Sequence, residues 1–238
     1  MKILAFDIWG DYGHFRKFYT TSSPLTFSFP PPSTIKGIIG AILGIDKTEY
    51  LKVFNSQECK VSVRLINPIK KIRIGLNLIN TKDGYWIPFK KKHHEPRTQI
   101  RTEFLKDPHF RLYFTHTNKE IFDKFTNFLK EHKSVYTVSL GLSELIADFE
   151  YIDILETEKC TNFSSEVVSP FSSSNLLENT LQIEEGKKYF KEKMPVIMNS
   201  DRIVEQYDNI IFEPTGKAIK TGLAECYRLS NEEYIEFF

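Results

Sequence analysis

The chain has 238 residues, with 32 basic and 31 acidic side chains and a formal net charge of +1. About 41% of its residues are apolar, which is enough for a core of ordinary size and excludes a disordered chain. No stretch approaches the roughly 20 apolar residues of a membrane span, and the first residues lack a signal-peptide pattern, so we expect a cytoplasmic protein with no membrane partner.

The N-terminal part predicts a strand, a loop and a helix. Residues 3–9 predict a strand, because apolar side chains at positions 4, 6 and 8 alternate with a second face. An aromatic-rich loop over residues 10–29 ends in three prolines, which exclude regular structure. Residues 33–43 then predict a helix with Ser33 as its N-cap. A second strand is expected over residues 60–66.

A long basic excursion over residues 68–107 comes next. Within it, residues 71–79 and 85–89 predict a hairpin that turns at Lys82, Asp83 and Gly84. An excursion of this length inside a compact fold is usually functional.

The third strand is expected over residues 109–115, with Phe110, Leu112 and Phe114 facing inward and Arg111 and Tyr113 outward. Asn118 then caps an amphipathic helix whose apolar stripe runs over residues 121–129. Residues 136–154 predict a fourth strand region, interrupted at Gly141.

This order of elements predicts an α+β fold. Strand, helix, strand, excursion, strand, helix and strand form the split βαβ pattern of a ferredoxin-like (RRM-like) domain, expected over residues 1–155 with an inserted basic thumb at about 68–107. Residues 156–238 are expected to form a smaller β region packed on the first, with strands over 194–198 and 203–212 and a Ser-rich loop over 163–175. Such a fold alone does not establish RNA binding.

The charges are unevenly distributed. Residues 60–111 contain 13 Lys or Arg against 4 Asp or Glu, a formal +9, whereas residues 141–238 contain 9 against 19, a formal −10. This asymmetry indicates a polyanion on one surface and protein neighbours on another. The alternative is that the charges only keep the surface solvated.

The start of the first helix has two unusual features. Gly37, Gly40 and Gly44 follow one another at spacings of three and four, although each glycine inside a helix costs about 0.5–1 kcal/mol relative to alanine. Something must therefore approach this backbone closely, either a ligand or a tightly packed part of the protein. Lys36 occupies the position where a capping box has Glu or Gln, so the free N–H groups and this lysine predict a phosphate site. Alternatively, the lysine head reaches water.

The basic excursion combines cations with aromatic rings. Tyr85, Trp86 and Phe89 come just before its most crowded stretch. The cations of that stretch are Lys90, Lys91, Lys92, His93, His94, Arg97 and Arg101. Cations that follow phosphates, beside rings that stack on bases, suit single-stranded RNA. The alternative is a flexible, solvated loop.

No common catalytic or metal-binding motif occurs. The six histidines form no metal-ligand pattern, and Cys59, Cys160 and Cys226 have no CxxC spacing, so we expect no cofactor and no metal. Lys92 and His93, together with a tyrosine, could nevertheless catalyse metal-independent RNA cleavage, which needs a base and a cation.

Three stretches resemble the Cas family five proteins of type I CRISPR systems, in a group like subtype I-B. They are residues 27–37 (FSFPPPSTIKG), residues 97–108 (RTQIRTEFLKDP) and residues 140–144 (LGLSE). The resemblance implies a ferredoxin-like domain with a thumb and a small C-terminal β region. It implies binding to the 5′ handle of the guide crRNA, contacts with the backbone and large subunits of Cascade, and access to target DNA through the complex.

One branch of that family cuts precursor RNA with Tyr, Lys and His. Lys92 and His93 resemble part of this set, but residues 33–43 contain no tyrosine, so we expect a subunit that binds RNA without cutting it. The predicted RNA-binding residues are Arg16, Ser33, Thr34, Lys36, Gly37, Lys90, Lys91, Lys92, His93, Arg97, Gln99 and Arg101. Two alternatives stay open: an endoribonuclease, and an interaction module whose partner is protein alone.

Overall fold

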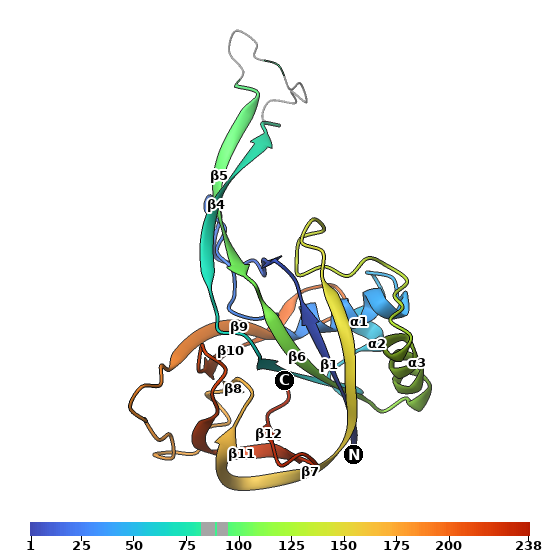
Figure 1. Ribbon diagram of the computed structural model, residues 1–238, viewed down its shortest axis with the longest axis vertical. Coiled ribbons are helices and arrows are strands. Elements are labelled where there is room, and N and C mark those ends of the chain that lie inside the picture. The colour runs from blue at the N-terminus through green and yellow to red at the C-terminus, as the bar shows by residue number, and fades with distance from the viewer. Residues whose placement is uncertain (82–88, 90–94) are drawn as a thin grey trace.

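The computed structural model describes residues 1–81, 89 and 95–238 and is built around a curled, six-stranded sheet (Figure 1). Its strands lie in the order β11-β12-β7-β1-β6-β3. Their bounds are Lys2–Trp9 (β1), Cys59–Leu65 (β3), His109–His116 (β6), Asp148–Val167 (β7), Ile219–Leu229 (β11) and Tyr234–Ile235 (β12). In the part β7-β1-β6-β3, each strand is antiparallel to its neighbours. The fold is therefore a mixed α/β fold made mostly of strands.

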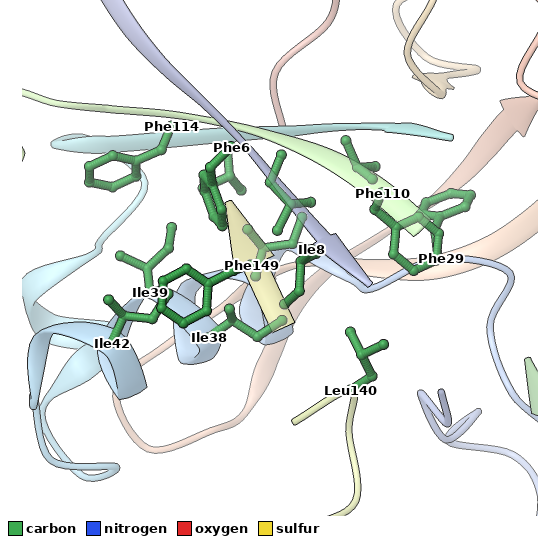
Figure 2. Close-up of a cluster of buried hydrophobic side chains, with 14 of the residues drawn as sticks. Phe6, Ile8, Phe29, Ile38, Ile39, Ile42, Phe110, Phe114, Leu140 and Phe149 are labelled. Carbon is green, nitrogen blue, oxygen red and sulfur yellow. The ribbon is translucent and has the colours of Figure 1, made fainter. Parts of the chain in front are cut away.

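Helices cover one face of this sheet (Figure 1). They are Pro32–Leu43 (α1), Tyr50–Val53 (α2) and Lys119–Lys130 (α3). The predicted alternation in β1 is confirmed, because Leu4, Phe6 and Ile8 are fully buried in the cluster that includes the isoleucines of α1. Figure 2 shows Ile39 and Ile42 of α1 within this cluster. Apolar burial of this kind fixes the helices to the sheet.

The predicted amphipathic helix is confirmed in α3. The side chain of Asn118 accepts a hydrogen bond from the Glu120 N–H and so caps the helix. Phe122, Phe125 and Leu129 are buried along one stripe. Within the part of the chain that the structure describes, no helix is long and apolar enough to cross a membrane.

The opposite face of the sheet is covered by other strands around Tyr113. We predicted that this side chain faces outward, but it is fully buried with Ile3 and Ala5 against Leu229 and Ile235. The prediction is wrong because β11 and β12 pair with the far half of β7 and fold over this face. The open aromatic sheet that reads RNA in RNA-recognition modules is therefore covered here.

β7 differs from the predicted fourth strand. It begins only at Asp148 and continues for 20 residues to Val167, so the first half pairs with β1 and the second half with β11. The predicted strand region over residues 136–147 is irregular instead, and the start of the predicted Ser-rich loop belongs to β7. The predicted domain boundary between residues 155 and 156 lies inside this strand.

A second, three-stranded sheet lies in the order β8-β10-β9. Its strands are Phe171–Ser172 (β8), Phe190–Met198 (β9) and Val204–Phe212 (β10). The two strands predicted in this part are confirmed, although β9 begins earlier than residue 194. Met194, Ile210 and Phe212 join the main core, so the second sheet packs directly on the first.

A two-stranded ribbon, extended at its root by Tyr12–Gly13 (β2), projects away from the body (Figure 1). It consists of Lys71–Ile79 (β4) and Arg97–Lys106 (β5), which pair along their whole length. We predicted residues 85–89 as the partner of the first strand; the structure shows β5 paired with β4, and residues 85–88 lie outside the described residues. The predicted turn at residues 82–84 lies outside the described residues.

Candidate nucleic-acid interface

The predicted N-cap at Ser33 is wrong, because the helix α1 already begins at Pro32. Pro31 is its N-cap, no side chain caps it, and Pro32 is its first residue. Proline is favoured there because its fixed φ suits the first turn and it has no N–H group to satisfy. Thr34 N donates to the Pro31 carbonyl at 2.9 Å, and Ile35 N does so at 3.0 Å. Among the described residues, Ser33 therefore keeps the one free N–H of this turn, and the predicted row of phosphate-binding N–H groups is absent.

Lys36 also differs from the predicted phosphate ligand. Its side chain is 8% exposed and lies near the Cys59 thiol on β3. Burial lowers the pKa of this amine, and no carboxylate in the described part of the chain pairs with it. Lys36 thus points into the protein and does not line the pocket described below.

The glycines of α1 are explained mainly by packing. A Cβ on Gly40 would lie 3.2 Å from the Tyr50 Cβ, and one on Gly37 would lie 3.8 Å from the Tyr50 ring. Gly44 ends the helix in the left-handed conformation, with φ of +78°. What approaches this backbone closely is therefore the chain's own α2, although Gly37 also borders a pocket.

A surface pocket of about 620 Å³ opens beside the first half of α1. Four segments line it: α1, the residues 45–50 that follow it, residues 136–141, and the end of β9 with the turn that follows. The lining residues used below are Ser33, Thr34, Gly37, Lys47, Tyr50, Tyr136, Thr137, Ser139, Met198 and Arg202. Three of the predicted RNA-binding residues, Ser33, Thr34 and Gly37, are thus brought together here.

The pocket offers rings, hydroxyl groups and cations. Tyr136 is 51% exposed, and burial raises the pKa of Tyr50, so Tyr50 is a neutral phenol near pH 7. The Arg202 guanidinium donates to the Lys47 carbonyl at 2.7 Å, which fixes this cation at the pocket. Rings that stack on bases, beside donors that bind phosphate, suit a nucleotide. Sequence reasoning missed Tyr50, Tyr136 and Arg202, because no local pattern connects them.

The ribbon gathers three further predicted residues on one face. Arg97, Gln99 and Arg101 alternate along β5 and are all exposed, opposite Ile79, Asn77 and Gly75 of β4. The intervening residues, such as Ile100 and Leu76, form the other, apolar face. Neither Arg97 nor Arg101 has a carboxylate partner among the described residues, so this face presents uncompensated positive charge.

Comparison with known proteins decides the family. The model described as "CRISPR-associated protein (Cas_Cas5)" matches residues 3–208, which is most of the chain. This chain belongs to the Cas5 family. The predicted resemblance is therefore confirmed. No curated protein sequence is similar enough to this Cas5-family chain to count as a relative.

Solved structures agree on the fold. A CRISPR protein from Archaeoglobus fulgidus has 12% sequence identity and a TM-score of 0.60 over 98% of this chain and 97% of that one. A chain of a structure described as "CRISPR RNA-guided surveillance complex" has 13% identity and a TM-score of 0.53, over 98% and 93%. At such low identity the similarity shows that the Cas5-family chain has the fold of these proteins.

The remaining predicted residues have different positions. Lys90, Lys91, Lys92 and His93 lie outside the described residues of this Cas5-family chain. Arg16 is exposed, and its guanidinium donates to the Thr20 carbonyl at 3.0 Å. Within residues 1–81, 89 and 95–238, no three His, Cys, Asp or Glu side chains lie close enough together to hold a metal ion.

Proposed function

We propose that this chain is the RNA-binding subunit of a CRISPR surveillance complex, where it holds the 5′ handle of the guide crRNA without cutting it. The family supports a role in a CRISPR system, and the fold is shared with a chain of an RNA-guided surveillance complex. The observation that carries the proposal is the combination of a nucleotide-sized pocket at α1 with an uncompensated cationic face on the ribbon.

The two surfaces would have separate tasks. Arg97 and Arg101 attract the phosphates, because an exposed guanidinium binds them with two parallel hydrogen bonds. The pocket holds one nucleotide between hydroxyl groups and the rings of Tyr50 and Tyr136. Phosphate contacts give affinity and register, whereas a base in the pocket gives preference for a particular handle.

We also propose that the part β7-β1-β6-β3, with α1 and α3, is ferredoxin-like. The antiparallel order of its four strands supports this, as does the position of one helix after β1 and one after β6. The ribbon then corresponds to the expected thumb between the second and third strands of that pattern. In this arrangement α1, which lines the pocket, and the ribbon are both attached to strands of the same sheet.

Charge reversal on the ribbon tests the proposal. We expect Arg101→Glu to weaken binding of handle RNA by about ten-fold at moderate salt. The slope of log affinity against log salt concentration should also become shallower by about 1, which corresponds to the loss of one phosphate contact. Lys119→Glu is the matched control, because Lys119 is also exposed and lies at the start of α3, away from the ribbon. If Arg97→Glu and Arg101→Glu both bind like the wild type, the cationic face has no role in RNA binding.

A second comparison tests the handle itself. The proposed subunit binds RNA that begins with the handle more tightly than scrambled RNA of equal length. Equal affinity for the two would remove the support for the handle, and binding to neither would favour a partner that is protein alone. The proposed protein partners are the backbone and large subunits of Cascade, and target DNA is reached through the complex.

The alternative is an endoribonuclease that uses Lys92, His93 and a tyrosine. α1 contains no tyrosine, and the two tyrosines at the pocket are Tyr50 and Tyr136. Burial raises the pKa of Tyr50, so its phenol stays protonated near pH 7 and does not supply the phenolate that would take the proton of a 2′-hydroxyl group. We therefore expect repeat RNA to stay intact with the pure protein in EDTA. Cleavage that His93→Ala abolishes would make the chain an enzyme.

A further inference from the structure

Three aromatic side chains form an exposed cluster, which we call the aromatic platform: Phe18, Tyr19 and Tyr207. They are 51%, 57% and 39% exposed. The Phe18 ring centroid lies 5.1 Å from that of Tyr19 and 4.8 Å from that of Tyr207. Phe18 and Tyr19 belong to the loop after β2, whereas Tyr207 is in β10. Large rings that gather on a surface usually mark a binding site.

The loop that carries two of these rings is held in place. Thr20 donates to the Lys17 carbonyl from both its N–H, at 3.2 Å, and its hydroxyl group, at 2.8 Å. Lys17 N donates to the Leu25 carbonyl at 2.9 Å, and Lys17 Nζ donates to the Glu192 carboxylate at 3.1 Å. The rings are therefore presented in a fixed arrangement, which lowers the entropy lost when a ligand binds.

Cations surround the aromatic platform. Lys193 Nζ lies 5.5 Å from the centroid of Tyr207, and Lys17 Nζ lies 5.9 Å from that of Tyr19. Arg16, two residues before Phe18, is exposed. Neither Arg16 nor Lys193 pairs with a carboxylate in the described part of the chain. Exposed rings beside free cations suit single-stranded nucleic acid better than an apolar protein surface, because the bases stack while the cations attract phosphates.

The β9–β10 hairpin connects the aromatic platform to the pocket. Met198 and Arg202 line the pocket, and Tyr207 pairs with Pro195, three residues back along β9 from Met198. That separation is about 10 Å along the strand. In the other direction along β9, Glu192 contacts Lys71, the first residue of the ribbon. The aromatic platform therefore lies between the pocket and the root of the ribbon.

We propose that the aromatic platform stacks successive bases of single-stranded RNA on its path between the pocket and the ribbon. This inference rests on the proposed function and extends it to residues outside the predicted RNA-binding set. Stacking tolerates any base, because every base has a π-face. The aromatic platform thus adds affinity without sequence preference, whereas the pocket supplies the preference.

The experiment compares two probes on the full-length chain. One is a short oligoadenylate RNA, and the other is an abasic ribose-phosphate oligomer of equal length. We expect Phe18→Ala combined with Tyr207→Ala to bind oligoadenylate about ten-fold or more weakly, with unchanged affinity for the abasic oligomer. Among single variants, Phe18→Ala should weaken oligoadenylate binding, whereas Phe18→Tyr should bind like the wild type because it keeps a ring. Phe163→Ala is the control and should bind oligoadenylate like the wild type. Phe163, in β7, is 39% exposed, and its ring stacks on that of Tyr234, in β12, at 5.2 Å between centroids.

The outcomes separate the two proposals. Equal oligoadenylate binding by the double variant and the wild type would overturn the aromatic platform and leave the proposed function intact. Equal losses for both probes would also overturn it, because the rings would then act without stacking on bases. A wild type that binds neither RNA would overturn both proposals. Loss of a co-purifying protein subunit, with RNA binding unchanged, would show that the rings contact protein instead.

Discussion

Lys17 Nζ donates a hydrogen bond to the Glu192 carboxylate at 3.1 Å, and this pair joins the loop after β2 to the second sheet. The same carboxylate accepts hydrogen bonds from Ser28 N, at 3.1 Å, and from Lys71 Nζ, at 3.4 Å. Burial opposes the charge of Glu192, but Lys71, Lys17 and Ser28 outweigh it and lower the pKa of this carboxyl. Glu192 thus fixes the loop, the ribbon root and β9 together.

Removal of this charge should destabilise the protein. We expect Glu192→Gln to lower the free energy of unfolding at pH 7 by about 2 kcal/mol, because Lys17 then stays largely buried without a countercharge, whereas Lys71 keeps its ion pair with Glu103 at 3.8 Å. The pKa of the folded state is lowered, so the stabilisation is present above the ordinary value of 4.5 and is lost as pH falls through the folded pKa. Urea unfolding from neutral to acidic pH measures this.

Glu178→Gln is the matched control, because Glu178 is exposed and has no ion pair within the described residues. It should leave the stability unchanged throughout. A gap between wild type and Glu192→Gln that stays constant as the pH falls would contradict the electrostatic explanation.

Gly141 is required by its conformation and by its surroundings. Its φ is +103°, and a Cβ there would collide with the His14 carbonyl oxygen. We expect Gly141→Ala to lower the unfolding free energy by about 2–4 kcal/mol and to disturb the pocket that this turn lines. Gly186→Ala is the control, because Gly186 has φ of +77° with nothing within 4 Å. It should cost only about 1 kcal/mol. Equal losses in the two variants would mean that the collision is unimportant.

Glu236 should make the stability depend on pH. It is 6% exposed and accepts hydrogen bonds from Ser172 N and the Asn175 side chain. Burial raises its pKa from 4.5 to about 8. Between these values the folded state binds more protons than the unfolded state, so stability falls as pH rises, by at most about 1.4 kcal/mol per pH unit. In Glu236→Gln this component disappears. Parallel profiles of the two proteins between pH 5 and 8 would show that Glu236 is not the source.

Lys36 offers a test of its predicted phosphate role. Because its amine is buried without a carboxylate partner, we expect Lys36→Met to raise the unfolding free energy by about 1 kcal/mol and to leave RNA affinity unchanged. Thermal unfolding and RNA titration of one preparation measure both. Normal stability with at least ten-fold weaker RNA binding would instead return Lys36 to the RNA site.

Local sequence patterns were enough to predict β1 and α3. The alternation around Phe6, the cap at Asn118 and the stripe through Phe125 each depend on residues a few positions apart, so their physics is local. The motif over residues 27–37 also led to the family, and the family model confirms it. The alternation of Arg97 with Arg101 indicated one face of a strand in the same way.

The tertiary structure alone decided which surfaces exist. Tyr113 is buried because strands from the C-terminus fold over it, and Lys36 faces inward because α1 packs on β3. The pocket needs Tyr50, Tyr136 and Arg202, which are distant in sequence and meet only when the second sheet packs beside α1. Periodicity reports which residues share one element, whereas a site formed between elements depends on long-range packing that no local pattern records.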